Sequence, residues 1–213
     1  MQAKHRNNRA KVAIKVIYRD QSSNAQGKGS SKNGISSTPS NLIRELALRE
    51  KMADQKLSTH HMTKLIECIE EDQYVYLITS WMNRRDLCCY MKKHQLPYLS
   101  HGELKKPLKN IISALKAIHQ AGYLHNDVQP CNILLEKKKG QQTYKTKLGG
   151  FSKVLPMGQA SSARETQVNL YRAPEVITQN DRSTASDVWS LGVSLYVLAT
   201  GRFPFKSRHA ISN

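Results

Sequence analysis

A histidine, an aspartate and an asparagine lie close together in the segment His125–Leu135. Pro130 stands between Asp127 and Asn132, and it excludes a regular helix because it lacks an N–H and fixes φ. The segment is therefore predicted to be a rigid loop that leads into a strand at Ile133–Leu135. A loop that presents a carboxylate and a carboxamide to one small volume is typical of a catalytic or metal-binding site.

Strand and helix patterns on both sides of this loop predict the elements that position it. Lys11–Tyr18 is β-branched and predicts a strand, on which Lys15 shares a face with Ala13 and Ile17. A lysine there either meets an anion or extends past the sheet edge to water. Further strands are predicted at 62–69, 74–79, 133–135 and 144–148, and helices near 40–52, 86–93, 103–121 and 187–200.

The composition is that of a basic globular protein. Thirty-three Lys and Arg residues against 16 Asp and Glu residues give a net charge of +17, which favours an acidic partner. The basic residues are spread along the chain, so a nucleic acid is a disfavoured partner. Apolar runs long enough to cross a membrane are absent from the sequence, as is the apolar core of a signal peptide, so no membrane association is expected.

The four cysteines are Cys68, Cys88, Cys89 and Cys131. None forms a C-x-x-C pair, and their spacing does not match a zinc site. Reduced thiols are therefore expected, in a cytoplasmic or nuclear compartment.

Several motifs occur in an order and at distances that resemble the protein kinase family. Val12–Lys15 matches the V-A-I-K strand of that family, and His125–Asn132 matches its catalytic loop H-R-D-L-x-x-x-N. Farther along, Ala173–Glu175 carries the A-P-E signature, and Asp187–Gly192 resembles the start of the helix below the loop. Together they span about 180 residues, and the form of the loop is most similar to that of serine/threonine kinases.

This resemblance implies an α+β, kinase-like bilobal fold. A partial small β lobe would span residues 1–82, with a flexible insert at 21–40 that is rich in Gly, Ser, Asn and Lys. A truncated, mainly α large lobe would span 83–213. Only about ten residues precede the Lys15 strand, so we expect this domain to lack the glycine-rich loop that covers ATP in the family.

The resemblance also implies the residues of a nucleotide site. Lys15 would hold the α- and β-phosphates of ATP and pair with a helix glutamate. Glu45 is the expected partner, and Glu50 stays open as the alternative. Thr79 would lie at the back of the nucleotide pocket, and Met82 would lie in the hinge between the lobes.

In the catalytic loop, the resemblance implies that Asp127 orients the substrate hydroxyl and that Asn132 binds magnesium. Asp187 would hold the backbone of the loop. Asp127 also has a purely structural interpretation, as an acid that caps the loop.

Departures from the family pattern fall on the groups that neutralise charge. In Lys147–Ser152, Gly150 replaces the magnesium-binding aspartate of D-F-G, and no aspartate occurs between Asp127 and Asp181. Gln129 replaces the catalytic-loop lysine, and Asn126 replaces the arginine before the catalytic aspartate. Phosphoryl transfer depends mostly on positioning and charge neutralisation, so each change removes part of the mechanism.

The sequence therefore predicts a pseudokinase-like domain that binds a protein partner, either a kinase or a kinase substrate, with weak or no phosphotransfer. Two alternatives remain open: an active serine/threonine kinase that uses Lys15, Asp127 and Asn132, and a partial product with little function alone. ATP and Mg²⁺ are expected to bind weakly at most, and no other cofactor is expected.

Overall fold

The computed structural model describes residues 2–4, 11–18, 44–49, 52, 56–71, 73–137, 139–140, 143–159, 169–207 and 209–212. The predicted insert 21–40 and Glu50 lie outside these residues. The chain divides into two compact units, one made of Met1–Ile43 and Lys64–Trp81, the other of Arg44–Thr63 and Met82–Asn213. The lobe boundary predicted at residue 82 stays a prediction.

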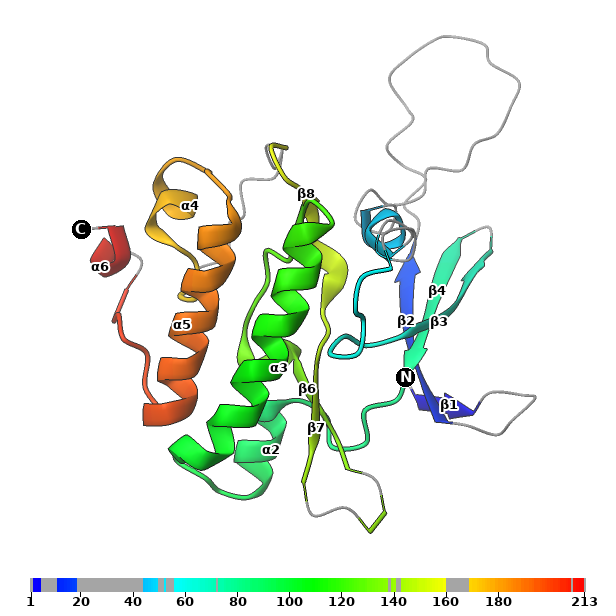
Figure 1. Cartoon of the computed structure of the whole chain (residues 1–213), viewed down its shortest axis with the longest axis horizontal. Helices are drawn as coiled ribbons and strands as arrows, with labels where there is room; N and C mark the ends of the chain where they lie inside the picture. Colours follow the sequence, from blue (N-terminus) through cyan, green and yellow to red (C-terminus); the bar gives the residue numbers. More distant parts are fainter. Residues whose placement is uncertain are drawn as a thin grey trace, which may run out of the picture. The chain divides into compact units, whose positions relative to one another are not determined.

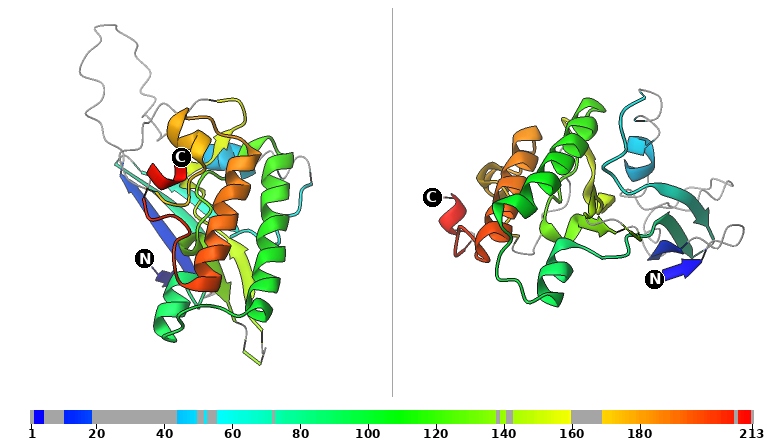
Figure 2. Two further views of the ribbon diagram at one scale, coloured as in Figure 1. Left: turned by 90° about the vertical axis from the view of Figure 1, so that its left-hand side faces the viewer. Right: turned by 60° about the horizontal axis from the view of Figure 1, so that its bottom comes forward.

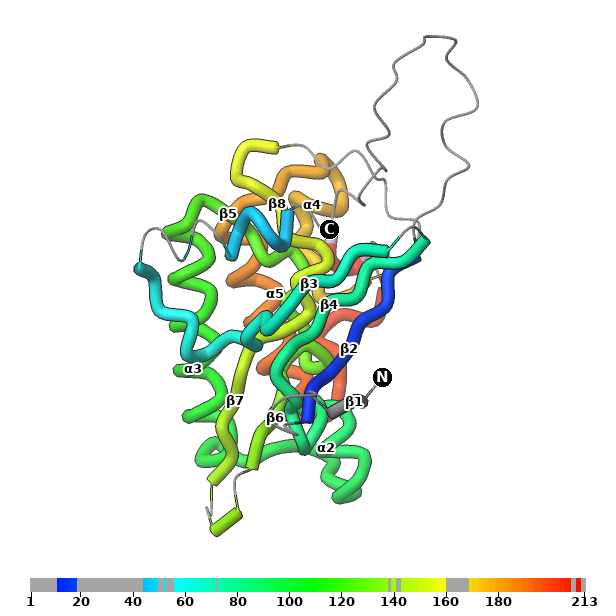
Figure 3. The backbone as a smooth tube through the Cα atoms, turned by 90° about the vertical axis from the view of Figure 1, so that its right-hand side faces the viewer, coloured from blue at the N-terminus to red at the C-terminus, as the bar shows by residue number. Residues whose placement is uncertain are grey.

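The first unit contains a four-stranded antiparallel sheet in the order β1-β2-β4-β3 (Figure 3). Its strands are β1 (Gln2–Lys4), β2 (Lys11–Tyr18), β3 (Leu65–Glu70) and β4 (Tyr74–Ser80). The predicted strand at Lys11–Tyr18 is confirmed as β2, because its β-branched residues suit a pleated, half-buried surface. Val75 and Leu77 of the central strand β4 are almost fully buried. Trp81 ends this unit.

The second unit is built around two long helices, α3 (His101–Gln120) and α5 (Thr184–Thr200), which pack against each other (Figures 1 and 2). Helix α2 (Leu87–Lys93) begins after Asp86, whose side chain accepts from the Cys89 N–H at 2.8 Å. Residues 44–49 are also helical and belong to this unit. Its core includes the fully buried side chains of Leu48, Ile111, Ile118, Leu148 and Leu198.

Short elements connect these helices to the predicted catalytic loop. The strand β5 (Tyr123–Leu124) pairs with β8 (Leu155–Pro156), and β6 (Ile133–Glu136) pairs with β7 (Lys145–Leu148). Single turns of 3-10 helix occur at Pro130–Asn132 and Phe151–Lys153. The short helices α4 (Pro174–Thr178) and α6 (His209–Ser212) come before and after α5 in the chain. The sequence shows no regular pattern in 150–175 and predicts an irregular segment there, which is wrong for the second 3-10 turn, for β8 and for the start of α4 at Pro174.

Helix α5 begins three residues before its predicted start, at Thr184 instead of Asp187. The Ser183 N–H donates to Ser186 Oγ at 3.3 Å, and this hydroxyl donates back to the Ser183 carbonyl at 2.7 Å. Farther along the helix, Trp189 stacks on Phe205 with ring centroids 5.7 Å apart.

Among the described residues, no helix combines the length and apolar character that a membrane crossing needs.

Helix α3 confirms the prediction from its three- and four-residue hydrophobic spacing. Its start is fixed by Ser100 and Glu103, which cap it reciprocally. The Glu103 carboxylate accepts from the Ser100 N–H at 2.8 Å and from its hydroxyl at 2.7 Å, so the pKa of Glu103 lies below its usual value. Pro107 lies inside the helix, and the burial of Ile111 and Ile118 on the core side offsets its missing N–H.

We expect Ser100→Ala to lower the free energy of unfolding by about 1 kcal/mol, because it removes the cap of α3. Urea denaturation followed by circular dichroism measures this change. Ser113→Ala is the matched control, because that hydroxyl only donates back to the Lys109 carbonyl at 2.9 Å on the exposed side of the same helix. Equal losses in the two variants would contradict the capping interpretation.

Candidate active site

The segment 125–132 confirms the predicted loop that leads into a strand. His125 follows β5 and is fully buried, and Asn126 adopts a left-handed backbone with φ of 59°. Pro130 opens the 3-10 turn, where its missing N–H costs no hydrogen bond, and β6 begins at Ile133.

Asp187 holds the start of this loop through both carboxylate oxygens. One oxygen accepts from the backbone N–H of His125 at 2.8 Å and lies 2.8 Å from His119 Nε2. The other accepts from the backbone N–H of Asn126 at 2.8 Å. Asp187 is only 1% exposed, so these bonds satisfy buried donors that water does not reach.

The ring of His125 is held in a neutral form. Its Nε2 lies 2.9 Å from the Gly149 carbonyl, and its Nδ1 accepts from the Asp127 N–H at 3.3 Å. One ring nitrogen therefore donates and the other accepts, which is the pattern of neutral imidazole. Burial lowers the pKa of His125, and the nearby Asp187 carboxylate only partly opposes this effect.

This depressed pKa predicts that acid destabilises the fold. Below the ordinary histidine pKa of 6.5 the unfolded chain binds a proton that folded His125 does not, so stability falls as pH falls. The effect of one such site is at most about 1.4 kcal/mol per pH unit. Urea denaturation from pH 7.5 to 5.5 should show a shallower slope for His125→Gln than for the exposed control His94→Gln. Equal pH slopes of the unfolding free energy in the two variants would contradict this prediction.

Asp127 and Asn132 lie together, as the loop pattern suggested. The Asn132 side-chain amide donates to the Asp127 carboxylate at 2.8 Å and to its backbone carbonyl at 2.7 Å. Gln129 donates to the same carboxylate at 3.1 Å, and Lys153 Nζ lies 3.3 Å from it. Two neutral donors and one ammonium group of this chain therefore surround the Asp127 carboxylate. The catalytic role predicted for Asp127 and the magnesium-binding role predicted for Asn132 stay predictions.

Gly150 adopts a left-handed backbone with φ of 75°, a conformation that glycine reaches at little cost. Any Cβ at this position would overlap the side-chain amide of Asn132. The space that a side chain at 150 would enter is thus filled by the amide that holds Asp127.

The residues around Asp127 do not fit a magnesium ion. Magnesium takes oxygen ligands in near-octahedral geometry and is usually held by carboxylates. Here position 150 offers no carboxylate, the Asn132 NH₂ group points at Asp127, and the Lys153 ammonium lies beside the same oxygen as Gln129. A cation is repelled by that ammonium and finds the acidic oxygens already hydrogen-bonded.

Two residues of the predicted nucleotide site belong to the first unit. Lys15 is exposed on β2 and lies opposite Leu77 of β4, while Thr79 lies opposite Ala13. Strand pairing therefore places Lys15 and Thr79 two positions apart along adjacent strands. Their roles stay predictions.

The other two predicted nucleotide residues belong to the second unit. Glu45 is 5% exposed and pairs with Arg49 at 2.9 Å, and Met82 is 6% exposed. Arg49 also donates to the Thr63 carbonyl at 2.9 Å and lies over the Phe151 ring. Glu45 as the partner of Lys15 stays a prediction, because the two residues fall in different units.

Sequence reasoning missed three basic residues in this region. Lys153 lies in the segment after Gly150, and Arg182 donates to the side chains of Asn126 and Asn180. Arg49 is the third. Arg49 and Arg182 are remote from the loop in sequence, and Lys153 lies in a segment without a regular pattern. Sequence spacing therefore could not have identified these three residues.

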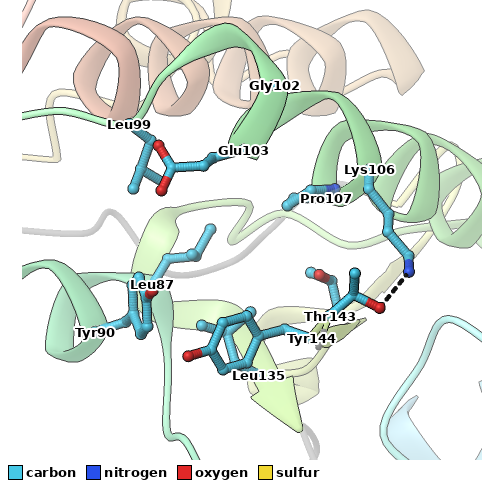
Figure 4. Close-up of a pocket in the computed structure, with 11 residues that line it drawn as sticks. Leu87, Tyr90, Leu99, Gly102, Glu103, Lys106, Pro107, Leu135, Thr143 and Tyr144 are labelled. Atoms are coloured by element: carbon cyan, nitrogen blue, oxygen red, sulfur yellow. Dashed lines mark hydrogen bonds between the residues drawn. The ribbon is translucent and has the colours of Figure 1, made fainter. Parts of the chain in front are cut away.

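Two cavities in the second unit differ in character. The space lined by Asp127, Asn169 and Tyr171 measures about 10 Å³, which is about the room one water needs. A larger cavity of about 280 Å³ lies between α2, α3 and the β6–β7 hairpin (Figure 4). Apolar residues such as Leu87 and Leu135 line it, and none of the predicted site residues does.

Comparisons with known proteins agree with these motifs. The family model described as the protein kinase domain matches residues 1–213. Serine/threonine-protein kinase unc-51 of Caenorhabditis elegans is 30% identical over 185 residues, which cover 84% of this chain and 21% of the relative. Serine/threonine-protein kinase ATG1c of Arabidopsis thaliana is 25% identical and is matched over 99% of this chain and 26% of its own length.

A third relative is named as inactive. Inactive serine/threonine-protein kinase PLK5 of Mus musculus is 26% identical over 76% of this chain and 26% of its own length. The chain thus spans about a fifth to a quarter of the length of these relatives. Its mixed helices and small sheets are those of an incomplete bilobal kinase fold. The chain belongs to the protein kinase family.

Proposed function

We propose that this domain acts as a pseudokinase, which binds a protein partner and transfers phosphate weakly or not at all. The observation that carries the proposal is the occupied carboxylate of Asp127, which Gln129, Asn132 and Lys153 all contact. A catalytic aspartate must accept the bond of a substrate hydroxyl. Here an incoming hydroxyl would have to displace one of these donors.

The magnesium ligands support the same proposal. Kinases of this family generally use ATP with magnesium, which neutralises the charge that develops on the transferred phosphate. Gly150 supplies no carboxylate, and the amide of Asn132 is turned toward Asp127. Transfer would therefore lack much of the usual charge neutralisation.

An apolar groove of the second unit supports the protein-binding half. It lies between α3 and α5, measures about 730 Å³ and includes Ile112 and Val188, which are 50% and 59% exposed. Exposed apolar surface of this kind is typical of an interaction site. Negative charge introduced at both positions, Ile112→Glu with Val188→Glu, should weaken partner binding without changing the Asp127 contacts.

Active serine/threonine phosphotransfer is the alternative. It is favoured by the proximity of the two side chains, because Asn132 Nδ2 lies 2.8 Å from Asp127 Oδ2. The names of relatives such as unc-51, which is called a kinase, favour it as well. Rotation of Lys153 and Asn132 away from Asp127 would then have to accompany nucleotide binding.

A radiolabel transfer assay with magnesium and with manganese distinguishes the two functions. We expect the labelling by the wild-type chain to equal that of Asp127→Ala. Metal-dependent labelling that Asp127→Ala abolishes and the exposed control Asp181→Ala keeps would overturn the proposal. A rise in Tm with ATP and magnesium, lost in Lys15→Ala, would show nucleotide binding separately from transfer.

A further inference from the structure

Two cysteines far apart in sequence meet beside the catalytic loop. Cys88 lies on α2, and Cys131 lies in the 3-10 turn Pro130–Asn132. Their Sγ atoms are 3.2 Å apart, with both thiols free. A disulfide bond is about 2.05 Å long, so closure needs an approach of only about 1 Å. The helix α2 and this turn pack on each other, which keeps the two thiols in place.

We propose that Cys88 and Cys131 form a redox-sensitive thiol pair, which hydrogen peroxide converts into a disulfide that joins α2 to the catalytic loop. This modification does not depend on whether the domain transfers phosphate. It acts on the residue that directly precedes Asn132, whose amide holds Asp127.

The surroundings of the two thiols give them different roles. Cys131 is exposed, so dissolved peroxide reaches it first. Cys88 is half-buried, and burial, the bond to Cys131 and the nearby Asp86 raise its pKa to about 12. Cys131 is therefore the thiol that peroxide oxidises, and Cys88 is the resolving thiol, which gives up its proton as it attacks the oxidised Cys131.

The reaction proceeds in two steps. The Cys131 thiolate attacks one oxygen of hydrogen peroxide, the O–O bond breaks, and a sulfenic acid and hydroxide form. The Cys88 sulfur then attacks the sulfenic sulfur, an S–S bond forms, and the sulfenic oxygen leaves as water with the proton of Cys88. The hydroxide of the first step takes up the proton that Cys131 released on forming its thiolate. In sum two thiols lose two electrons and two protons, and one peroxide is reduced to two waters.

A bound soft metal ion is the competing occupant of this position. One ligand atom each of Asp86, Cys88 and Cys131 lie within 4.8 Å of one another. Structural zinc takes four protein ligands, however, and Asp86 already accepts from the Cys89 N–H. Arg84 and Arg85 precede Asp86 in the chain and add positive charge that a cation must overcome.

Peptide mapping of the full chain tests the proposal in a Cys89→Ser background, which removes the neighbouring thiol. The protein is reduced, exposed to graded hydrogen peroxide, alkylated and digested without reductant. We expect a linked peptide pair that contains Cys88 and Cys131 and that dithiothreitol separates. The disulfide would close the stretch of chain between Cys88 and Cys131 into a loop, which should raise Tm by about 5–10 °C.

Variants identify the order of the steps. Cys88→Ser should leave a sulfenic acid on Cys131 that dimedone traps, while Cys68→Ser is the control and should link like its parent. Sulfinic acid on Cys131 with Cys88 still open to alkylation would overturn the proposal. Stoichiometric zinc retained by the reduced chain, lost in Cys131→Ser, with no linked peptide after peroxide, would assign a metal site instead. None of these readouts measures phosphotransfer, so failure here leaves the proposed function untouched.

Discussion

Asp187→Ala is expected to lower the free energy of unfolding by about 3–5 kcal/mol. The carboxylate of Asp187 is buried and accepts from the backbone N–H groups of His125 and Asn126, both at 2.8 Å, and it pairs with His119. Alanine leaves both N–H groups without an acceptor in a place that water does not reach. Each such orphan costs about 1–3 kcal/mol.

Urea denaturation measures the loss for Asp187→Ala, with Asp181→Ala as the matched control. Asp181 is exposed, so its replacement should change stability by less than about 0.5 kcal/mol. Asp187→Asn keeps one acceptor oxygen and should fall between the two. If Asp187→Ala costs no more than Asp181→Ala, the carboxylate does not hold the loop.

Gly150→Asp should destabilise the chain by about 2–4 kcal/mol more than Gly158→Asp, while restoring the carboxylate that the kinase pattern has at this position. Both glycines have left-handed backbones, with φ of 75° and 77°, so both substitutions carry the same backbone cost. A Cβ at Gly158 meets nothing within 4 Å, whereas one at Gly150 overlaps Asn132. Only the first substitution displaces the amide that holds Asp127.

Phosphotransfer gives the second readout of Gly150→Asp. We expect labelling to stay at the level of Asp127→Ala, because Lys153 and Gln129 still contact the Asp127 carboxylate. Metal-dependent labelling in Gly150→Asp alone would mean that the missing ligand was the sole defect. A stability loss equal to that of Gly158→Asp would show that Asn132 moves aside freely.

Local patterns in the sequence were sufficient for most of the elements. The β-branched run of β2 and the hydrophobic spacing of α3 depend on near neighbours, and both elements form where expected. The start of α5 was placed too late because Ser183 and Ser186 do not carry the usual glutamate signature of a helix start. A helix start that is capped by two serines is hard to find from hydrophobic spacing alone.

The candidate site was predictable only in part. The proximity of Asp127 and Asn132 follows from a short loop, which a motif describes. The ammonium of Lys153 and the contact between Cys88 and Cys131 arise from packing between distant segments, which no local pattern records. The sequence suggested that cations and metal ligands were missing, but not that the chain itself supplies Lys153 beside the aspartate.

The two tryptophans of the chain are divided between its two units, Trp81 ending the first and Trp189 lying on α5 of the second. Each indole can therefore serve as a separate optical reporter. With Trp81→Phe, the emission of Trp189 would follow the melting of the helical unit alone, whereas Trp189→Phe would isolate the sheet. Independent denaturation midpoints for the two emissions would mean that the domain is two cooperative bodies on one polypeptide.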